Sequence, residues 1–275
     1  AIVLNATLVA VVTLRSWFLK SFEFTPASMP DDVPMLRSRV RKFLAKELVH
    51  MQAADKAKSW SGFDAGFSQK LAEEGWIGMM WPHELGGDEA TALHRYVVIE
   101  ELLAAGAPVA AHWIADRQSG AHIIRYASHE VQRRFLPAIA DGKMYFCIGM
   151  SEPNSGSDLA SIKTNAHRVE GGWVINGSKI WTTFAHRSHM MIALVRTTPK
   201  VESRHAGLSQ FIIDLSAEGV KIKPIIDHQD EEHFGEIFFD NVFVADDMLL
   251  GKEGDGWAQV NSELALERSG PERYL

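Results

Sequence analysis

The chain has 275 residues, 46% of them hydrophobic and 23% charged, which is the composition of an ordinary globular protein large enough for one or two cores. Its formal net charge of −7 leaves no basic footprint for nucleic acid. The single cysteine, Cys147, excludes an intrachain disulfide and a cluster of thiolate ligands, and it fits a reducing compartment.

Residues 1–28 differ from the rest of the chain. The stretch 1–14 is mainly apolar, but it is too short to span a bilayer and lacks the basic start and cleavage site of a secretory signal. Because the chain starts without Met and Met29 precedes the first convincing helix, we interpret 1–28 as a non-native or misassigned extension. A weakly membrane-associated arm is the alternative, and no integral membrane segment is predicted.

Residues 29–142 are predicted to form an all-helical domain. One helix starts near Pro34, with apolar residues at the spacing of a single face. Asp64 is expected to cap a second helix, which Gly75 ends. A third covers about 91–105 and a fourth about 109–126, and Ser128 caps a fifth that closes at Asp141.

The pattern changes to strands in residues 143–250. Seven segments rich in β-forming residues are expected, at 145–150, 163–169, 173–182, 189–196, 208–214, 220–226 and 234–244. Since no helices separate them, we predict an antiparallel, barrel-like sheet domain rather than a parallel nucleotide-binding fold. A helical pattern resumes within 251–275, so the predicted fold class is α+β.

A polar stretch, 149–161, follows the apolar run 145–148, in which Cys147 is predicted to be buried. Gly156 between Ser155 and Ser157 lets a bulky ligand approach the main chain, and the hydroxyls can bond phosphate or carbonyl oxygens. A serine-rich turn without a ligand is the alternative.

Several motifs, in a fixed order, resemble those of the acyl-CoA dehydrogenase family. The run G-M-S-E-P-N-S-G-S-D-L-A-S at 149–161 agrees with the family signature at every fixed position. The runs at 134–137, 175–183 and 238–244 also agree, and ordered motifs over 33–275 are far more specific than a lone glycine motif. The resemblance implies an N-terminal helical domain, a β domain and a C-terminal four-helix domain, of which 251–275 would be the first, truncated part.

The resemblance also implies that the protein binds FAD and removes hydrogen across Cα–Cβ of an acyl-CoA. In this family a carboxylate takes the α-proton while hydride passes to FAD. The implied flavin contacts are Ile148, Met150, Ser151, Ser157, Trp181, Thr182 and Thr183. Ser157 would in addition lie beside the CoA arm.

The position of the base differs within the family. Most members carry the catalytic glutamate far along the C-terminal domain, whereas a minority use a glutamate on the first helix after the β domain, directly before an arginine. Here that position reads Glu267-Arg268. The resemblance therefore implies Glu267 as the base and Arg268 as a CoA contact, with a base beyond residue 275 as the alternative.

Two other functions stay open: a non-catalytic subunit or flavin- and CoA-binding module completed by a partner chain, and an acyl-CoA oxidase. The resemblance implies an electron-transferring flavoprotein as acceptor and a homo-oligomer, either dimer or tetramer. It also implies a cytoplasmic location in a bacterium, which is favoured, or the mitochondrial matrix in a eukaryote. The acidic and histidine-rich run at 227–233 fits no familiar metal site and is interpreted as a solvated loop.

Overall fold

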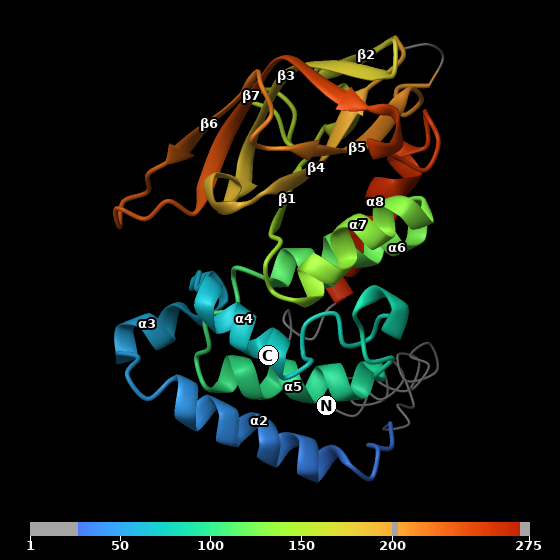
Figure 1. Cartoon of the computed structure of the whole chain (residues 1–275). Helices are drawn as coiled ribbons and strands as arrows, with labels where there is room; N and C mark the ends of the chain where they lie inside the picture. Colours follow the sequence, from blue (N-terminus) through green and yellow to red (C-terminus); the bar gives the residue numbers. More distant parts are fainter. Residues whose placement is uncertain (1–26, 200–202, 270–275) are drawn as a thin grey trace, which may run out of the picture. The chain divides into compact units, whose positions relative to one another are not determined.

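The computed structural model of the chain describes residues 27–199 and 203–269 (Figure 1). From Asp32 onward the described residues belong to one unit. Of the extension predicted over 1–28, residues 1–26 lie outside the described ranges. None of the helices within those ranges has the length and apolar character needed to cross a bilayer.

Helices make up the region before the sheet, as predicted. They are α2 (Val33–Glu47), α3 (Ala53–Lys58), α4 (Ala65–Glu73), α5 (Ala92–Ala104), α6 (Ala121–Tyr126) and α7 (His129–Ala140), with the short turns η1 (Ser59–Ser61) and η2 (His83–Leu85) and the π-helical turn η3 (Ala115–Gly120) between them.

Two helix starts carry the predicted caps. Asp64 accepts a bond from the N–H of Phe67 at 2.9 Å, and the Ser128 hydroxyl accepts one from Val131 at 3.3 Å. Each cap satisfies a backbone N–H that the helix start leaves open. Behind these starts, α2 packs along α5 and buries its apolar face (Figure 1).

The helix predicted over 109–126 is interrupted. Residues 110–112 form a turn, and the helical stretch that follows contains η3 before it continues as α6. A π-helical turn holds one more residue than an α-helical turn, and a periodicity of 3.6 does not reveal such an insertion. The insertion changes which side chains face the sheet, and it involves residues of the site described below.

The sheet contains β1 (Phe146–Gly149), β2 (Asn165–Val169), β3 (Gly172–Thr183), β4 (Met190–Arg196), β5 (Leu208–Asp214), β6 (Val220–Ile225), β7 (Phe234–Ala245) and the short β8 (Leu249–Leu250). All seven predicted segments are strands, and β8 was not expected. The strand order is β6-β7-β3-β2-β4-β5-β8, with β1 beside β4. Cys147 is fully buried in β1, and burial raises the pKa of its thiol to about 12.

The sheet domain that was predicted as antiparallel and barrel-like is present, but its sheet is mixed. Strand β1 pairs with β4 in parallel, and β2 meets β4 in parallel at Asn165 and Arg196, while the remaining strand pairs are antiparallel. The chain makes the β2–β3 hairpin between β1 and β4, which gives β4 the length of connection that a parallel return requires. Alternation of side chains carries no information about strand direction, so the sequence did not reveal this pairing.

After the sheet, the chain forms α8 (Gly256–Ser269). Val260 of α8 is buried in an apolar cluster with Leu194 of β4 and Leu208 of β5. The helix also contacts η3. Because α8 is anchored on both the sheet and η3, its residues Leu264 and Glu267 line the same cavity as the ends of β1 and β3.

Candidate active site

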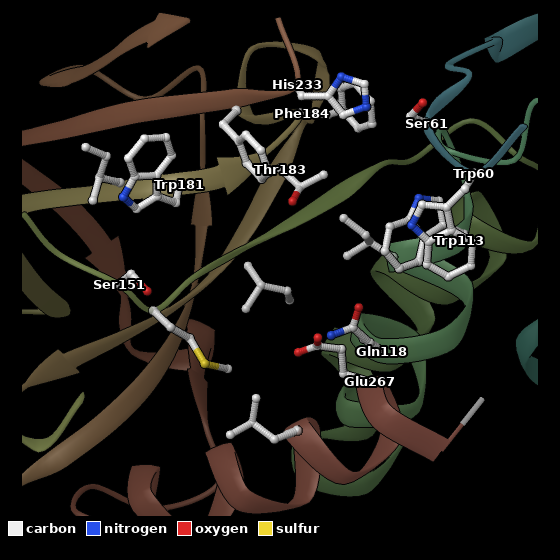
Figure 2. Close-up of a pocket in the computed structure, with 16 residues that line it drawn as sticks. Trp60, Ser61, Trp113, Gln118, Ser151, Trp181, Thr183, Phe184, His233 and Glu267 are labelled. Carbon is white, nitrogen blue, oxygen red and sulfur yellow. The ribbon is translucent and has the colours of Figure 1, made fainter. Parts of the chain in front are cut away.

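A cavity of about 460 Å³ lies between the sheet, the helical region and α8 (Figure 2). The sheet side is lined by Ile148, Met150, Ser151, Ile180, Trp181, Thr183 and Phe184, with His233 and Phe234 at the start of β7. The helical side is lined by Trp60, Ser61, Trp113, Ile114 and Gln118, and α8 contributes Leu264 and Glu267. In Figure 2, Trp181 and Ser151 lie across the cavity from Trp60 and Trp113.

A buried ion pair holds the sheet side. The ammonium of Lys179, fully buried in β3, donates to the carbonyl of Met150 at 2.9 Å and to Glu152 at 3.0 Å. Glu152 also accepts bonds from the N–H groups of Lys163 and Thr164. Burial alone would raise the pKa of Glu152, but the charge of Lys179 and these donors outweigh it and lower that pKa. The main chain at Met150, where the polar stretch begins, is therefore fixed by charge-assisted bonds.

An irregularity in β3 turns Trp181 toward the cavity. The pairing of β3 with β7 shifts register between Lys179 and Thr182, as in a β-bulge. Trp181 has a φ of 60°, a left-handed conformation that is uncommon for a bulky residue. As a result its indole is 58% exposed and forms a flat wall, whereas Thr182 is buried. Bulges often occur beside binding sites, where they redirect a side chain.

Two aromatic rings in close, tilted contact form much of the helical side. The rings of Trp60 and Trp113 lie 4.3 Å apart between centroids, and the guanidinium of Arg117 lies 4.3 Å from the Trp113 ring. Arg117 donates a bond to the amide oxygen of Gln118 at 3.1 Å. Arg117 and Gln118 both belong to η3, and both are buried. The π-helical turn thus supplies a polar amide to a wall that is otherwise aromatic.

Helix α8 brings a carboxyl group to the same cavity. Glu267 and Leu264 lie on its last turns and line the cavity together with Gln118. Figure 2 shows the side chains of Glu267 and Gln118 pointing into the cavity opposite the sheet. A carboxyl group, an amide, three hydroxyl-bearing residues and flat aromatic walls therefore surround one space.

Models of known protein families match most of the chain. The model "Acyl-CoA dehydrogenase, N-terminal domain" matches residues 30–143, and "Acyl-CoA dehydrogenase, middle domain" matches residues 147–242. The chain belongs to the acyl-CoA dehydrogenase family. The helical region, the mixed sheet and the following helix are the family's fold.

Relatives and solved structures agree with this membership. The acyl-CoA dehydrogenase IpdE1 of Mycobacterium tuberculosis is 38% identical over 244 residues, which are 86% of this chain and 63% of that protein. The structure of the Tcur3481-Tcur3483 steroid ACAD has a TM-score of 0.78 at 28% identity, covering 90% of this chain and 64% of that one. The ChsE4-ChsE5 complex from Mycobacterium tuberculosis has a TM-score of 0.75 at 30% identity, covering 88% and 61%. The chain thus spans just under two thirds of the length of these relatives.

Some of the predicted site residues line the cavity and others do not. Those that line the cavity are Ile148, Met150, Ser151, Trp181, Thr183 and Glu267. Ser157 and Arg268 are exposed and do not line it, and Thr182 points into the protein. Cavity residues that the sequence did not indicate include Trp60, Trp113, Gln118 and Phe184. His233 also lines the cavity, and it belongs to the run 227–233 that was interpreted as a solvated loop. For Gln118 a signal existed, because Arg117 and Gln118 are polar residues in a largely apolar helical segment.

The sheet side of the cavity suits the isoalloxazine ring of FAD, the cofactor typical of the family. Trp181 offers an exposed flat ring, and the hydroxyls of Ser151 and Thr183 line the cavity on either side of it. A planar ring with polar edges requires this combination of a stacking surface and edge donors. The residues present therefore fit a flavin.

Proposed function

We propose that this protein is an FAD-dependent acyl-CoA dehydrogenase that removes hydrogen across Cα–Cβ of an acyl-CoA thioester, with Glu267 as the base. One observation carries the proposal: Glu267 lines the same cavity as Ser151, Trp181 and Thr183, on the opposite side. A proton acceptor and a flavin surface facing each other are what a reaction on two adjacent carbons needs.

In the proposed reaction the α-hydrogen leaves as a proton to a Glu267 carboxylate oxygen, and the Cα–Cβ double bond forms as the β-hydrogen departs with its electron pair. A bound FAD would supply the acceptor for that hydride. Met150 and Ser151 would hold one edge of the flavin, and Trp181 would pack on its ring beside Thr183. The aromatic walls would exclude water, which strengthens every charge interaction in the cavity.

The CoA part would extend out of the cavity. Ser157 and Arg268 are exposed, which suits contacts with a pantetheine arm and a phosphate rather than with the acyl group. Arginine is the side chain best matched to phosphate oxygens. Exchanging Arg268 for Gln should therefore raise KM for acyl-CoA more than it lowers kcat.

We further propose a broad, ring-bearing acyl group as substrate. The side of the cavity facing Trp181 includes the rings of Trp60 and Trp113, and flat walls favour flat ligands. Phe184 and His233 add two more rings on the sheet side. The Tcur3481-Tcur3483 protein, named a steroid ACAD, is a structural neighbour. The family also suggests an electron-transferring flavoprotein as acceptor and a homo-oligomer as the working form.

Flavin reduction in Glu267→Gln tests the assignment. In the FAD-loaded protein mixed with ring-bearing and straight-chain acyl-CoA thioesters, the loss of flavin absorbance should slow by about 10²–10⁴-fold relative to wild type. The control Glu253→Gln removes an exposed carboxyl in the loop before α8 and should leave the rate unchanged. Near-normal reduction in Glu267→Gln would remove Glu267 as the base.

The remaining outcomes separate the other functions. Wild-type flavin that no acyl-CoA bleaches would contradict a dehydrogenase, and flavin retained only with a partner chain would favour the binding module. Peroxide formed without an added acceptor would favour the oxidase.

A further inference from the structure

Glu263 is a second carboxyl on α8, one helical turn before Glu267. Residues four apart lie on one face of a helix, so both side chains project on the side of α8 that faces the rest of the protein. Their surroundings differ: Glu267 borders the cavity, while Glu263 is fully buried. A fully buried carboxyl so close to a proposed base requires a physical explanation.

A buried chain of hydrogen bonds links Glu263 to the sheet and to α6. The amide nitrogen of Gln210, in β5, donates to Glu263 Oε2 at 2.7 Å. The amide oxygen of Gln210 is 2.7 Å from Nε2 of His122, in α6, so this nitrogen carries the proton and donates. Within the described residues, Oε1 of Glu263 and Nδ1 of His122 have no hydrogen-bond partner.

This environment favours the uncharged acid. Ionising a carboxyl group is costly when the resulting carboxylate accepts only one hydrogen bond and is shielded from water. Burial raises the pKa of Glu263 to about 8 against the opposing effect of the Gln210 bond, and the negative charge of Glu267 adds a weaker increase. Burial also lowers the pKa of His122, so the histidine is neutral as well.

The charged groups on the elements packed against Glu263 do not compensate the negative charge that its ionisation would create. They are Glu267 and Arg268 on α8, His122 and Arg125 on α6, Asp116 and Arg117 on η3, Arg196 on β4 and Asp214 on β5. Arg196 bonds to the carbonyls of Ala160 and Ala206. Arg125 bonds to the Ser262 hydroxyl on the exposed side of α8, and Asp116 pairs with Arg95. Glu267 is the charge that acts on Glu263, and it has the same sign.

We propose that Glu263 is a positioning residue for the reaction: as a neutral acid bonded through Gln210 to His122, it holds α8 so that Glu267 faces the acyl group, and its ionisation disturbs this arrangement. The inference rests on the proposed function, because it takes Glu267 as the base. Gln259 ties an earlier turn of α8 to the carbonyl of Leu250 at 2.7 Å. Glu263 provides such a tie one turn from Glu267.

The first test compares Glu263→Gln with Glu263→Ala in the FAD-loaded protein. Glutamine keeps the size and the bond to Gln210 but cannot ionise, so we expect near-normal reduction at neutral pH and no fall in kcat/KM above about pH 8, where the wild type falls. Alanine should slow flavin reduction about tenfold or more and enlarge the isotope effect of an α-deuterated substrate, because a misplaced base slows proton abstraction. Equal pH profiles for wild type and Glu263→Gln, or a normal isotope effect in Glu263→Ala, would overturn the proposal.

A second measurement does not depend on catalysis. The folded-state pKa of Glu263 lies above its unfolded value, so its contribution to stability is fully present below about pH 4.5 and is lost as pH rises through about 8. The melting temperature of wild type should therefore fall relative to that of Glu263→Gln between about pH 5 and 9. Parallel curves would contradict a neutral Glu263. If Glu267→Gln were fully active while the melting curves diverged as expected, the base assignment would fail and the positioning role with it, and only the neutral state of buried Glu263 would stand.

Discussion

The sheet side of the cavity is held by hydrogen bonds to the main chain, whereas the helical side is held by the packing of rings. On the sheet side, Ile180 donates to the carbonyl of Ser151 at 2.9 Å and Lys179 to that of Met150 at 2.9 Å. On the helical side, the rings of Trp60 and Trp113 pack against each other at a tilt, and the guanidinium of Arg117 lies over both. A single substitution removes a hydrogen bond to a buried charge completely, whereas substitutions of different size reduce the packing of rings by degrees. We therefore expect all-or-none effects on one side and graded effects on the other.

The largest effect is expected from Lys179→Met. The substitution leaves Glu152 buried without its counter-charge, which costs about 3–5 kcal/mol of unfolding free energy for a broken buried pair. Urea unfolding measures this loss, and the flavin content should fall with it. The loss should shrink at acid pH: the pKa of Glu152 is lowered in the wild type, so without Lys179 the group protonates more readily and the uncompensated charge disappears.

Lys163→Met is the matched control for this prediction. Lys163 is exposed, and only its backbone N–H bonds to Glu152, so the stability should change little. Equal stability of Lys179→Met and Lys163→Met would show that the buried pair does not hold the sheet side.

The difference between the two sides also explains what the sequence could reveal. Met150, Ser151, Trp181 and Thr183 belong to contiguous motifs at strand ends, so the family resemblance that these motifs carry indicated them. Glu267 could be predicted from its resemblance to the Glu-Arg pair that follows the β domain in part of the family. These roles stay predictions, although the residues line one cavity.

The residues on the helical side of the cavity could not be predicted from sequence motifs. Trp60, Trp113 and Gln118 come from separate turns, and the inserted residue of η3 changes the face that Gln118 presents. Likewise, alternation along β3 would place Thr182 and Trp181 on opposite faces, and the bulge decides which one faces the cavity. Local patterns predict elements well, but they do not predict inserted residues or strand direction.

A graded effect is expected from Trp113 on the helical side. Trp113→Ala should widen the cavity and change the ratio of kcat/KM for a ring-bearing over a straight-chain acyl-CoA by about 10–200-fold, the range for an altered apolar pocket. Trp113→Phe keeps an aromatic ring, so its ratio of kcat/KM should lie between those of the wild type and Trp113→Ala. Steady-state kinetics with a matched pair of thioesters measures the ratio. An unchanged ratio in Trp113→Ala would place the acyl group elsewhere in the cavity.

The smallest effects concern Thr182 and Thr183, neighbours in β3 that face opposite ways. Thr183 lines the cavity, so Thr183→Val should weaken flavin binding by about 0.5–1.5 kcal/mol, the value of one lost hydrogen bond, with little change in stability. Thr182 is buried, and its hydroxyl has no hydrogen-bond partner among the described residues. Because Thr182→Val removes that unsatisfied group at nearly constant volume, it should leave flavin binding unchanged and the melting temperature equal or higher. Flavin titration and thermal melts of the two variants separate the predictions. If Thr182→Val lost flavin and Thr183→Val did not, the side chain of Thr182 rather than that of Thr183 would face the cavity. The cavity-lining residues of β3 after Lys179 would then have to be reassigned.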